Sequence, residues 1–212
     1  ITHVMKHIQQ LYHNDGTSPW DDATYDNIVD ILKEDYQLDV ETYTIGAPVK
    51  SSNKDVIKLP YFMGSMNKYK TQKLISNWIK KYNGPYIISA KLDGISAMYI
   101  NGKLYTRGNG THGRDISYLI PFLTLGTNHN QVLRGELIMK KKTFSTKYKK
   151  TFSNPRNLVC GILNRQYKPE YEDVYKDIDF VIYDIYNTDS NYYDKFSWSV
   201  SYTHLTLPTR AV

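Results

Sequence analysis

Cysteine and long hydrophobic runs are nearly absent from this sequence, and each absence excludes a class of protein. The 212-residue chain has one cysteine, Cys160, which excludes an internal disulfide framework and a self-contained cysteine-rich zinc site. No apolar run approaches the ~18 residues of a membrane span. No charged segment followed by an apolar one marks an export signal at the start. We therefore expect an intracellular protein in a reducing compartment such as the cytoplasm, away from the membrane.

Arginine is also scarce, and its distribution is uneven. The net charge is +6, with lysine outnumbering arginine 21 to 6, which suits a partner with phosphates only modestly. Arginine's planar fork binds phosphate and carboxylate in ways that lysine cannot. Chance clustering in a small number also accounts for the pattern, so the motifs must decide. Five arginines fall within one stretch: Arg107, Arg114, Arg134, Arg156 and Arg165.

The two ends of the sequence are unusual. The chain opens with Ile1 rather than methionine. Val200 to Thr209 reads VSYTHLTLPT, which resembles the in-frame translation of a transposon adapter used in sequencing libraries. The alternative is a genuine strand with a turn at Pro208. We favour the artefact and leave residues 200–212 out of the argument on fold and function.

Helical spacing dominates the first part of the chain. Apolar residues recur at helical intervals in 1–11, and again in 22–32, where acidic residues occupy the first turn. Residues 39–60 are mixed in composition and contain two prolines and a glycine, which is typical of a linker. A third helix is expected over 71–82, ended by Gly84-Pro85.

The pattern changes to strands from Tyr86 onward. Asn101-Gly102 lies between two alternating segments, which is the strongest short signal for a β-hairpin. The sequence predicts an α+β protein, with a small helical cap before a mixed, largely antiparallel domain. The expected strands are 86–92, 96–100, 103–107, 131–139 and 178–186.

Lys91-Leu92-Asp93-Gly94 follows the first expected strand. Residues two apart on a strand share a face, so an amine and a carboxylate would project into the same space. An amine can act as a nucleophile when its pKa is lowered, and a carboxylate can orient it or hold a metal ion. Gly94 would let the backbone turn sharply beside a ligand. Alone, the tetrapeptide is also compatible with a surface ion pair before a turn.

Further motifs follow in the strand-rich part. The loop Arg107–Gly113 has three glycines whose neighbouring amide groups could bind an anion, or it is a flexible loop. Arg134 and Glu136 share one strand face, as functional groups or as a surface ion pair. Arg156 follows Asn154-Pro155 in a polar turn. Tyr183 is either core or a platform for a nucleobase.

In this order, these motifs resemble the adenylation (nucleotidyltransferase) domain of NAD⁺-dependent DNA ligases. The resemblance implies that Lys91 attacks the α-phosphorus and carries AMP, with Asp93 supporting this step and Mg²⁺ held through phosphates rather than by protein ligands. Arg107 and Glu136 would hold the AMP ribose and phosphate, and Tyr183 would stack on adenine. The other nucleotide-binding residues that it implies are Ser65, Met66 and Arg156.

The resemblance extends into the helical cap, where it favours NAD⁺ over ATP. Tyrosines can sandwich a cationic nicotinamide ring, and aspartates can accept hydrogen bonds from its ribose and amide. An ordinary acidic first turn is the alternative interpretation of these residues taken alone. The implied nicotinamide-mononucleotide (NMN) pocket comprises Tyr12, His13, Asp22, Tyr25 and Asp26.

The resemblance divides the chain into an NMN-binding segment at 1–45, an incomplete adenylation domain at 46–199, truncated at its C-terminus, and the excluded residues 200–212. It implies a monomeric enzyme that seals nicked double-stranded DNA, in repair or replication, although we expect weak activity from the chain alone. Ser89 and Asn109 depart from the family, which usually has a glutamate and an aspartate there, and Arg165 has no firm role. Two other hypotheses stay open: an ATP- or GTP-dependent RNA ligase or capping enzyme, and a non-catalytic nucleotide- or nucleic-acid-binding module.

Overall fold

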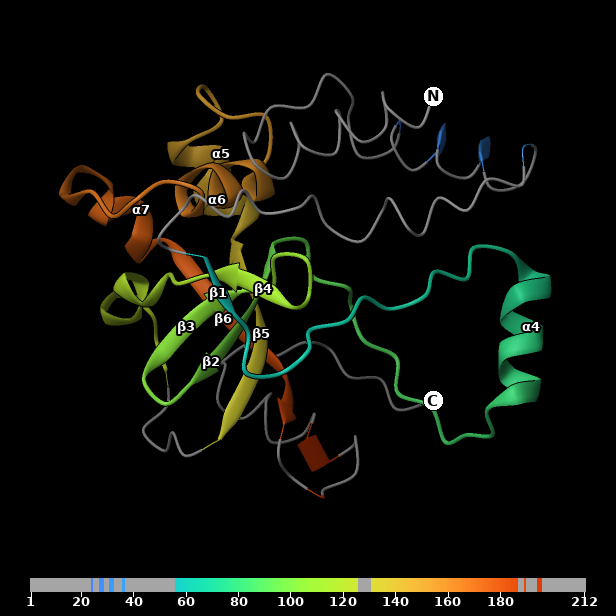
Figure 1. Ribbon diagram of the computed structural model, residues 1–212. Helices are drawn as coiled ribbons and strands as arrows, with labels where there is room; N and C mark the ends of the chain where they lie inside the picture. Colours follow the sequence, from blue (N-terminus) through green and yellow to red (C-terminus); the bar gives the residue numbers. More distant parts are fainter. Residues whose placement is uncertain are drawn as a thin grey trace.

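The computed structural model describes residues 56–125 and 131–186, together with a few single positions: 24, 27, 28, 31, 32, 36, 189, 194 and 195. At its centre is a four-stranded antiparallel sheet in the order β3-β2-β5-β6 (Figure 1). The mixed α+β architecture with antiparallel sheets agrees with the predicted fold class. The strands of this sheet are β2 (Ile95–Ile100), β3 (Lys103–Thr106), β5 (Val132–Met139) and β6 (Ile178–Tyr186).

A second, two-stranded sheet lies beside the first. It pairs β1 (Val56–Lys58) with β4 (His112–Arg114). The predicted linker over 39–60 therefore contains a short strand, because β1 finds its partner far along the chain and no local signal announces that pairing. The earlier residues of the predicted linker lie outside the described part.

The sheet and the helices share one hydrophobic core. β5 alternates strictly, with Leu133 and Leu137 on the helix side and Arg134 and Glu136 on the other face. Burial of one large apolar side chain contributes about 1.5–3 kcal/mol, so this side supplies much of the stability. The helices are α5 (Lys141–Lys147), α6 (Pro155–Leu163) and α7 (Glu172–Lys176), with the 3₁₀ segments η2 (Ser117–Phe122) and η3 (Pro169–Tyr171).

The start of α6 corrects one prediction. Asn154-Pro155-Arg156 is the beginning of a helix rather than a polar turn. The Asn154 side chain caps the helix by accepting a hydrogen bond from the Asn157 amide at 2.7 Å, and Pro155 occupies the first turn. Leu158 and Val159 are fully buried against the sheet, so packing holds the helix in place. Arg156 consequently projects from a fixed helical turn.

The hairpin between β2 and β3 has the predicted position and turn. Asn101 and Gly102 both have left-handed backbones, with φ of 50° and 73°. This pair of conformations is that of a type I′ turn, which matches the natural twist of two antiparallel strands. The pairing Ala97↔Thr106 follows from this turn.

The predicted strand over 86–92 is wrong. These residues are not part of a ladder with any strand that the structure describes, and Lys91 is exposed. The apolar residues Ile87 and Ile88 are exposed as well, at 38% and 77%. An apolar β-branched run indicates extended backbone, but a strand also needs a partner, and a single sequence cannot supply that information.

The helix predicted over 71–82 is α4 (Gln72–Lys81). The Thr71 hydroxyl caps it by accepting from the Leu74 amide at 3.3 Å, and Lys80 and Lys81 lie in its last turn. None of its residues is buried. Figure 1 shows α4 standing apart from the sheets, connected by extended chain on both sides.

The predicted helix over 1–11 lies outside the described residues, as do most positions of the second one. Residues 24, 27, 28, 31 and 32 are helical, in agreement with a helix over 22–32. Within the part of the chain that the structure describes, every helix is too short or too polar to cross a membrane.

Candidate nucleotide site

The face of the four-stranded sheet opposite the helices is partly buried and brings together several of the predicted site residues. Ser96 on β2 lies directly opposite Glu136 on β5. Arg107, just after β3, donates its backbone N–H to the Ser96 carbonyl at 2.8 Å. The side chain of Tyr183 on β6 meets the Ser96 hydroxyl, with 2.8 Å between the two oxygens. Residues from all four strands therefore converge on one patch.

Tyr183 reaches this patch through a β-bulge. The register between β5 and β6 shifts at Arg134/Gly135, so that Ile182 pairs with Gly135 and Asp184 with Arg134. Tyr183 is the extra residue between them. A bulge redirects side chains and changes which residues share a face. Here Ile182 and Ile185 both join the core while Tyr183 faces the Arg134 guanidinium, whose carbon lies 5.9 Å from the ring centre.

Glu136 is a half-buried carboxylate surrounded by cations. Burial raises its pKa above the ordinary value, and the positive charges of Lys91, Arg156, Arg107 and Arg134 oppose that rise. No described residue donates a hydrogen bond to this carboxylate. The residue is only half-buried, so its carboxylate oxygens stay accessible to a ligand that carries hydrogen-bond donors. Glu136 is therefore ready to accept hydrogen bonds from hydroxyl groups of a ligand.

Arg107 has a similar environment with the opposite charge. Burial lowers its pKa, and repulsion from Arg134 adds to the effect, while Glu136 counteracts it. With Lys91, Arg134 and Arg156, it gives the patch four cations against the two carboxylates of Glu136 and Asp93. A site with excess positive charge and partial burial attracts a ligand that carries several negative charges, such as a pyrophosphate.

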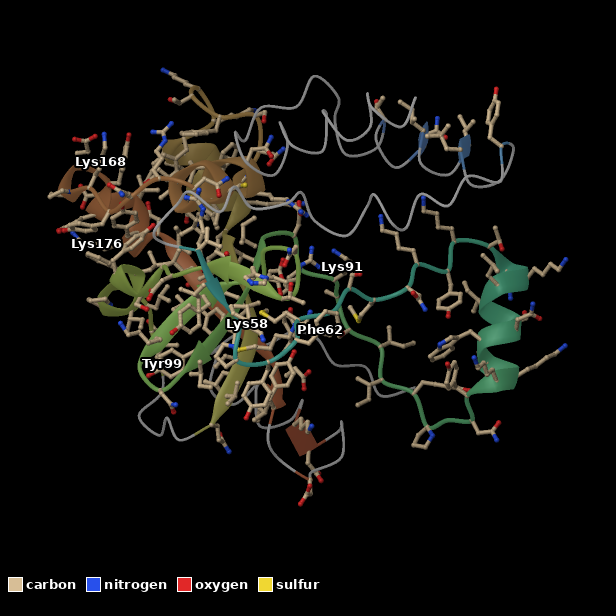
Figure 2. All side chains as sticks on the ribbon, in the orientation of Figure 1. Lys58, Phe62, Lys91, Tyr99, Lys168 and Lys176 are labelled. Carbon is tan, nitrogen blue, oxygen red and sulfur yellow. The ribbon has the colours of Figure 1, made fainter. Side chains whose placement is uncertain are left out.

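Lys91 and Asp93 lie at the end of the exposed segment that returns from α4. Figure 2 shows Lys91 beside the sheets, on the side of α4 and far from Lys168 and Lys176. Asp93 is 70% exposed and accepts a hydrogen bond from Arg156 Nη1 at 3.1 Å. Asp93 therefore pairs with Arg156, from α6, and not with Lys91 as in the alternative of a surface Lys–Asp pair. This contact brings two predicted site residues together.

The glycine loop after β3 is rigid rather than open. Asn109 Oδ1 accepts hydrogen bonds from the Thr111 amide at 3.0 Å, from its hydroxyl at 2.9 Å and from the His112 amide at 2.8 Å. The amides of Asn109 and Gly110 donate to His112 and Arg107 carbonyls. The prediction that this loop offers its amides to an anion is wrong for these four groups, because the loop already uses them. The loop instead supports Arg107.

The segment with Ser65 and Met66 reaches the same patch. The Met63 amide donates to the Gly110 carbonyl at 2.9 Å, and the Gly64 carbonyl accepts from Arg134 Nη2 at 2.7 Å. Ser65 and Met66 follow directly and are exposed, Met66 at 81%. They are thus held at the border of the patch with their side chains free to meet a ligand.

Sequence reasoning missed two residues of this site. Arg134 was recognised only as a member of an Arg/Glu pair, and Ser96 only as part of a strand. The alternation of β5 places Arg134 on the face of Glu136, and the hairpin register places Ser96 there too. The signal was present in the strand pairing, which the sequence indicates only indirectly.

The residues predicted for an NMN pocket lie outside the described part of the structure: Tyr12, His13, Asp22, Tyr25 and Asp26. Among the residues that are described, no cluster of three or more His, Cys, Asp or Glu side chains has the arrangement of a metal site. A metal ion held by phosphates needs only one or two protein carboxylates.

A lysine amine, a half-buried glutamate and several arginines beside one sheet face define a site suited to nucleotidyl transfer. Residues 60–206 match the family described as the NAD-dependent DNA ligase adenylation domain. The chain belongs to this family. It is 41% identical over 187 residues to a DNA ligase of Acanthamoeba polyphaga mimivirus, and the aligned part covers 83% of this chain and 29% of that protein. It is 30% identical over 203 residues to a DNA ligase of Borrelia garinii, covering 84% of this chain and 30% of that protein. The chain thus spans less than a third of the length of these relatives.

Replacing Glu136 by glutamine is expected to stabilise the protein at neutral pH. The folded protein raises the pKa of Glu136, so folding favours the protonated carboxyl group. The wild type is therefore fully stable below the pKa of the unfolded state and loses stability as pH rises through the pKa of the folded state. Glutamine avoids this loss, so Tm at pH 8 should rise by about 2 °C or more. The gain should vanish near pH 4.

Thermal unfolding of Glu136→Gln across this pH range checks the prediction. Glu170→Gln is the control, since the Glu170 side chain is 63% exposed and forms a surface ion pair with Lys168. A Tm of Glu136→Gln below that of the wild type at pH 8 would show that the surrounding cations, not burial, govern this carboxylate.

Proposed function

We propose that this chain is the nucleotide-transferring part of an NAD⁺-dependent DNA ligase and that Lys91 becomes covalently attached to AMP. The observation that carries the proposal is the convergence of Lys91, Arg107, Glu136 and Arg156 around one partly buried sheet face. Family membership supports the assignment of the donor nucleotide.

In the proposed reaction, the Lys91 Nζ lone pair attacks the α-phosphorus of NAD⁺. A P–N bond forms, and the bond between this phosphorus and the bridging oxygen breaks. NMN leaves with the bonding electrons, and the amine loses a proton to solvent or a nearby base. Neighbouring positive charge screens the phosphate under attack.

Each neighbouring side chain has a role that follows from its chemistry. Arg107 and Arg156 would bind the phosphates, and Glu136 would accept hydrogen bonds from the ribose. Tyr183 would stack on adenine through the ring face opposite Arg134. Asp93 would orient the Lys91 amine. Ser65 and Met66 would line the same nucleotide.

Mg²⁺ would complete the charge balance when it is bound. The exposed carboxylate of Asp93 fits a cation that takes most of its ligands from phosphates and water. Such an ion would neutralise negative charge on the pyrophosphate. In the complete enzyme, AMP would pass to the 5′-phosphate of nicked double-stranded DNA, and the 3′-hydroxyl would then seal the nick. Tyr12, His13, Asp22, Tyr25 and Asp26 would bind the NMN half of the donor.

Mass spectrometry of the intact chain after incubation with NAD⁺ and Mg²⁺ tests the proposal, with ATP in a parallel sample. We expect a gain of one AMP with NAD⁺ alone, and peptide mapping should place it on Lys91. The adduct should be lost in acid, since a phosphoramidate is acid-labile. Long incubation is appropriate because we expect slow reaction in a chain that covers less than a third of its relatives.

A gain of AMP from ATP instead would favour the RNA-ligase or capping-enzyme class. No adduct from either donor, together with no NAD⁺ binding in calorimetry, would contradict an enzymatic role and favour a non-catalytic module.

A further inference from the structure

The Arg134 side chain is directed at other parts of the protein, with contacts to Gly64, Tyr186 and Tyr183. Its Nη2 donates to the Gly64 carbonyl at 2.7 Å, and its Nη1 donates to the Tyr186 hydroxyl at 3.3 Å. The guanidinium also lies against the ring of Tyr183, 5.9 Å from its centre. One side chain thus contacts the chain 70 residues upstream and a strand 52 residues downstream.

The segment that Arg134 contacts is attached to the sheets at several points, from Leu59 to Gly64. Residues 59–70 have no helix or strand. The Met63 amide is bonded to Gly110, and the Phe62 carbonyl accepts from the Tyr186 hydroxyl at 3.3 Å. Met63 is buried at 1% exposure, whereas Phe62 is 66% exposed. Beyond Met63, the bond from Arg134 to Gly64 is therefore the last fixed point before Ser65 and Met66.

The same guanidinium helps to fix the ring of Tyr183. The Tyr183 hydroxyl is held by Ser96 at 2.8 Å, which fixes one end of the side chain. Arg134 lies over one face of the ring, so a planar ligand would have to stack on the opposite face. Burial works against the charge of Arg134, but Tyr183 and Tyr186 outweigh it, and its pKa lies above the ordinary value. Arg134 therefore stays charged.

The fork of the Arg134 side chain suits two directed contacts, which a lysine at the same position could not make. Its Nε is buried without a hydrogen-bond partner among the described residues, which costs free energy that a purely stabilising side chain would avoid. Lysine has one nitrogen and cannot donate to Gly64 and Tyr186 along the two directions of the fork.

We propose that Arg134 is a positioning residue, which locks the Gly64-Ser65-Met66 segment and the Tyr183 ring into one preformed nucleotide-binding surface. The proposal deepens the proposed function, since it assigns to Arg134 the alignment of two parts of the same site. It acts through its neighbours and does not itself touch the reacting atoms.

The test compares Arg134→Met, Arg134→Lys and Lys147→Met in the full chain. Lys147 is the matched control because it also makes two charged hydrogen bonds, at 3.0 and 2.8 Å, but to Asp177, which ends α7 just before β6. Hydrogen exchange without nucleotide should be about tenfold or more faster over residues 61–66 in Arg134→Met, since a bond from a charged donor is lost. Lys147→Met should leave these residues unchanged.

A second readout uses AMP attachment to Lys91. In Arg134→Met, KM for NAD⁺ should rise about tenfold or more, while the maximal rate changes much less, because preformed binding is lost and the nucleophile is intact. Arg134→Lys should recover part of the affinity. Unchanged exchange over 61–66, or an equal fall of maximal rate and affinity, would overturn the proposal.

Two further outcomes are also decisive. If amide hydrogens exchange rapidly throughout Arg134→Met, this variant is unfolded and Arg134→Lys takes its place in the test. Faster exchange of Arg134→Lys confined to residues 61–66 supports the positioning role, and faster exchange throughout the chain overturns it. If the wild type attaches no AMP, the proposed function fails, but nucleotide-free exchange over 61–66 still decides whether Arg134 holds this segment.

Discussion

Replacing Lys91 by arginine is expected to remove the AMP adduct altogether, a loss of at least about 10³-fold, as for removal of a covalent nucleophile. Arginine stays protonated at every accessible pH, so it has no lone pair with which to attack phosphorus. It also keeps the positive charge that Lys91 contributes near Glu136. The substitution thus separates nucleophilic attack from the electrostatics of the site.

The measurement is the adduct fraction by intact mass after long incubation, with NAD⁺ binding measured by calorimetry on the same samples. NAD⁺ binding should persist in Lys91→Arg within about threefold, because the charge is kept. Lys81→Arg, at the end of α4, is the matched control and should form the adduct like the wild type. An adduct of undiminished yield in Lys91→Arg would show that AMP is attached elsewhere.

The strands that carry the site were predictable where their signal is local. Asn101-Gly102 fixes both the position and the register of the β2–β3 hairpin. The alternation of β5 places Arg134 and Glu136 on one face, since the helix side takes the leucines. Such patterns suffice because each turn or strand face is specified by adjacent residues.

The bulge at Tyr183 was not predictable from its own strand. β6 is apolar nearly throughout, so no alternation distinguishes a regular strand from a bulged one. The choice depends on packing of both Ile182 and Ile185 into the core, and therefore on the opposite strand. For the same reason, a platform and a plain core residue were equally good interpretations of Tyr183.

Whether a helix was predictable from the sequence depended on the capping residues at its start. Asn154-Pro155 carries a recognisable cap and first-turn proline, which a closer interpretation would have assigned to a helix start. By contrast, α5 has no side-chain cap and no acidic residue in its first turn. It is held by burial of Phe144 in the core, a tertiary contact that the surrounding lysines conceal.

Contacts over long sequence distance account for the rest of the site. The bond from Arg134 to Gly64 spans 70 residues, and the pair of Arg156 with Asp93 spans 63. The family resemblance brought Arg156 and Asp93 into one site before any geometry was known. It did not assign Arg134, whose importance follows from where the chain near Gly64 lies against the sheet.

Replacing Gly94 by alanine is expected to destabilise the protein by about 3 kcal/mol, which corresponds to a fall in Tm of about 6–12 °C. A Cβ at Gly94 would lie 2.2 Å from the Leu137 carbonyl oxygen and 2.8 Å from Ile138 Cγ2. The first contact is with backbone, which cannot move aside as a side chain can. Since Ile95 pairs with Leu137, the methyl group would push β2 and β5 apart where their ladder starts.

This geometry changes the expected role of Gly94. It has no left-handed φ, so glycine is required there for close approach of two strands and not for a sharp turn. Gly102→Ala is the matched control: its φ is 73° and nothing lies within 4 Å of a Cβ, so only backbone strain of about 1 kcal/mol is expected. Denaturant unfolding of both variants measures the difference. A loss at Gly94 no larger than at Gly102 would contradict the steric argument. A larger loss would support it. Because the contact with β5 would also help to position Lys91, three residues earlier, adduct formation should fall even where the variant is fully folded.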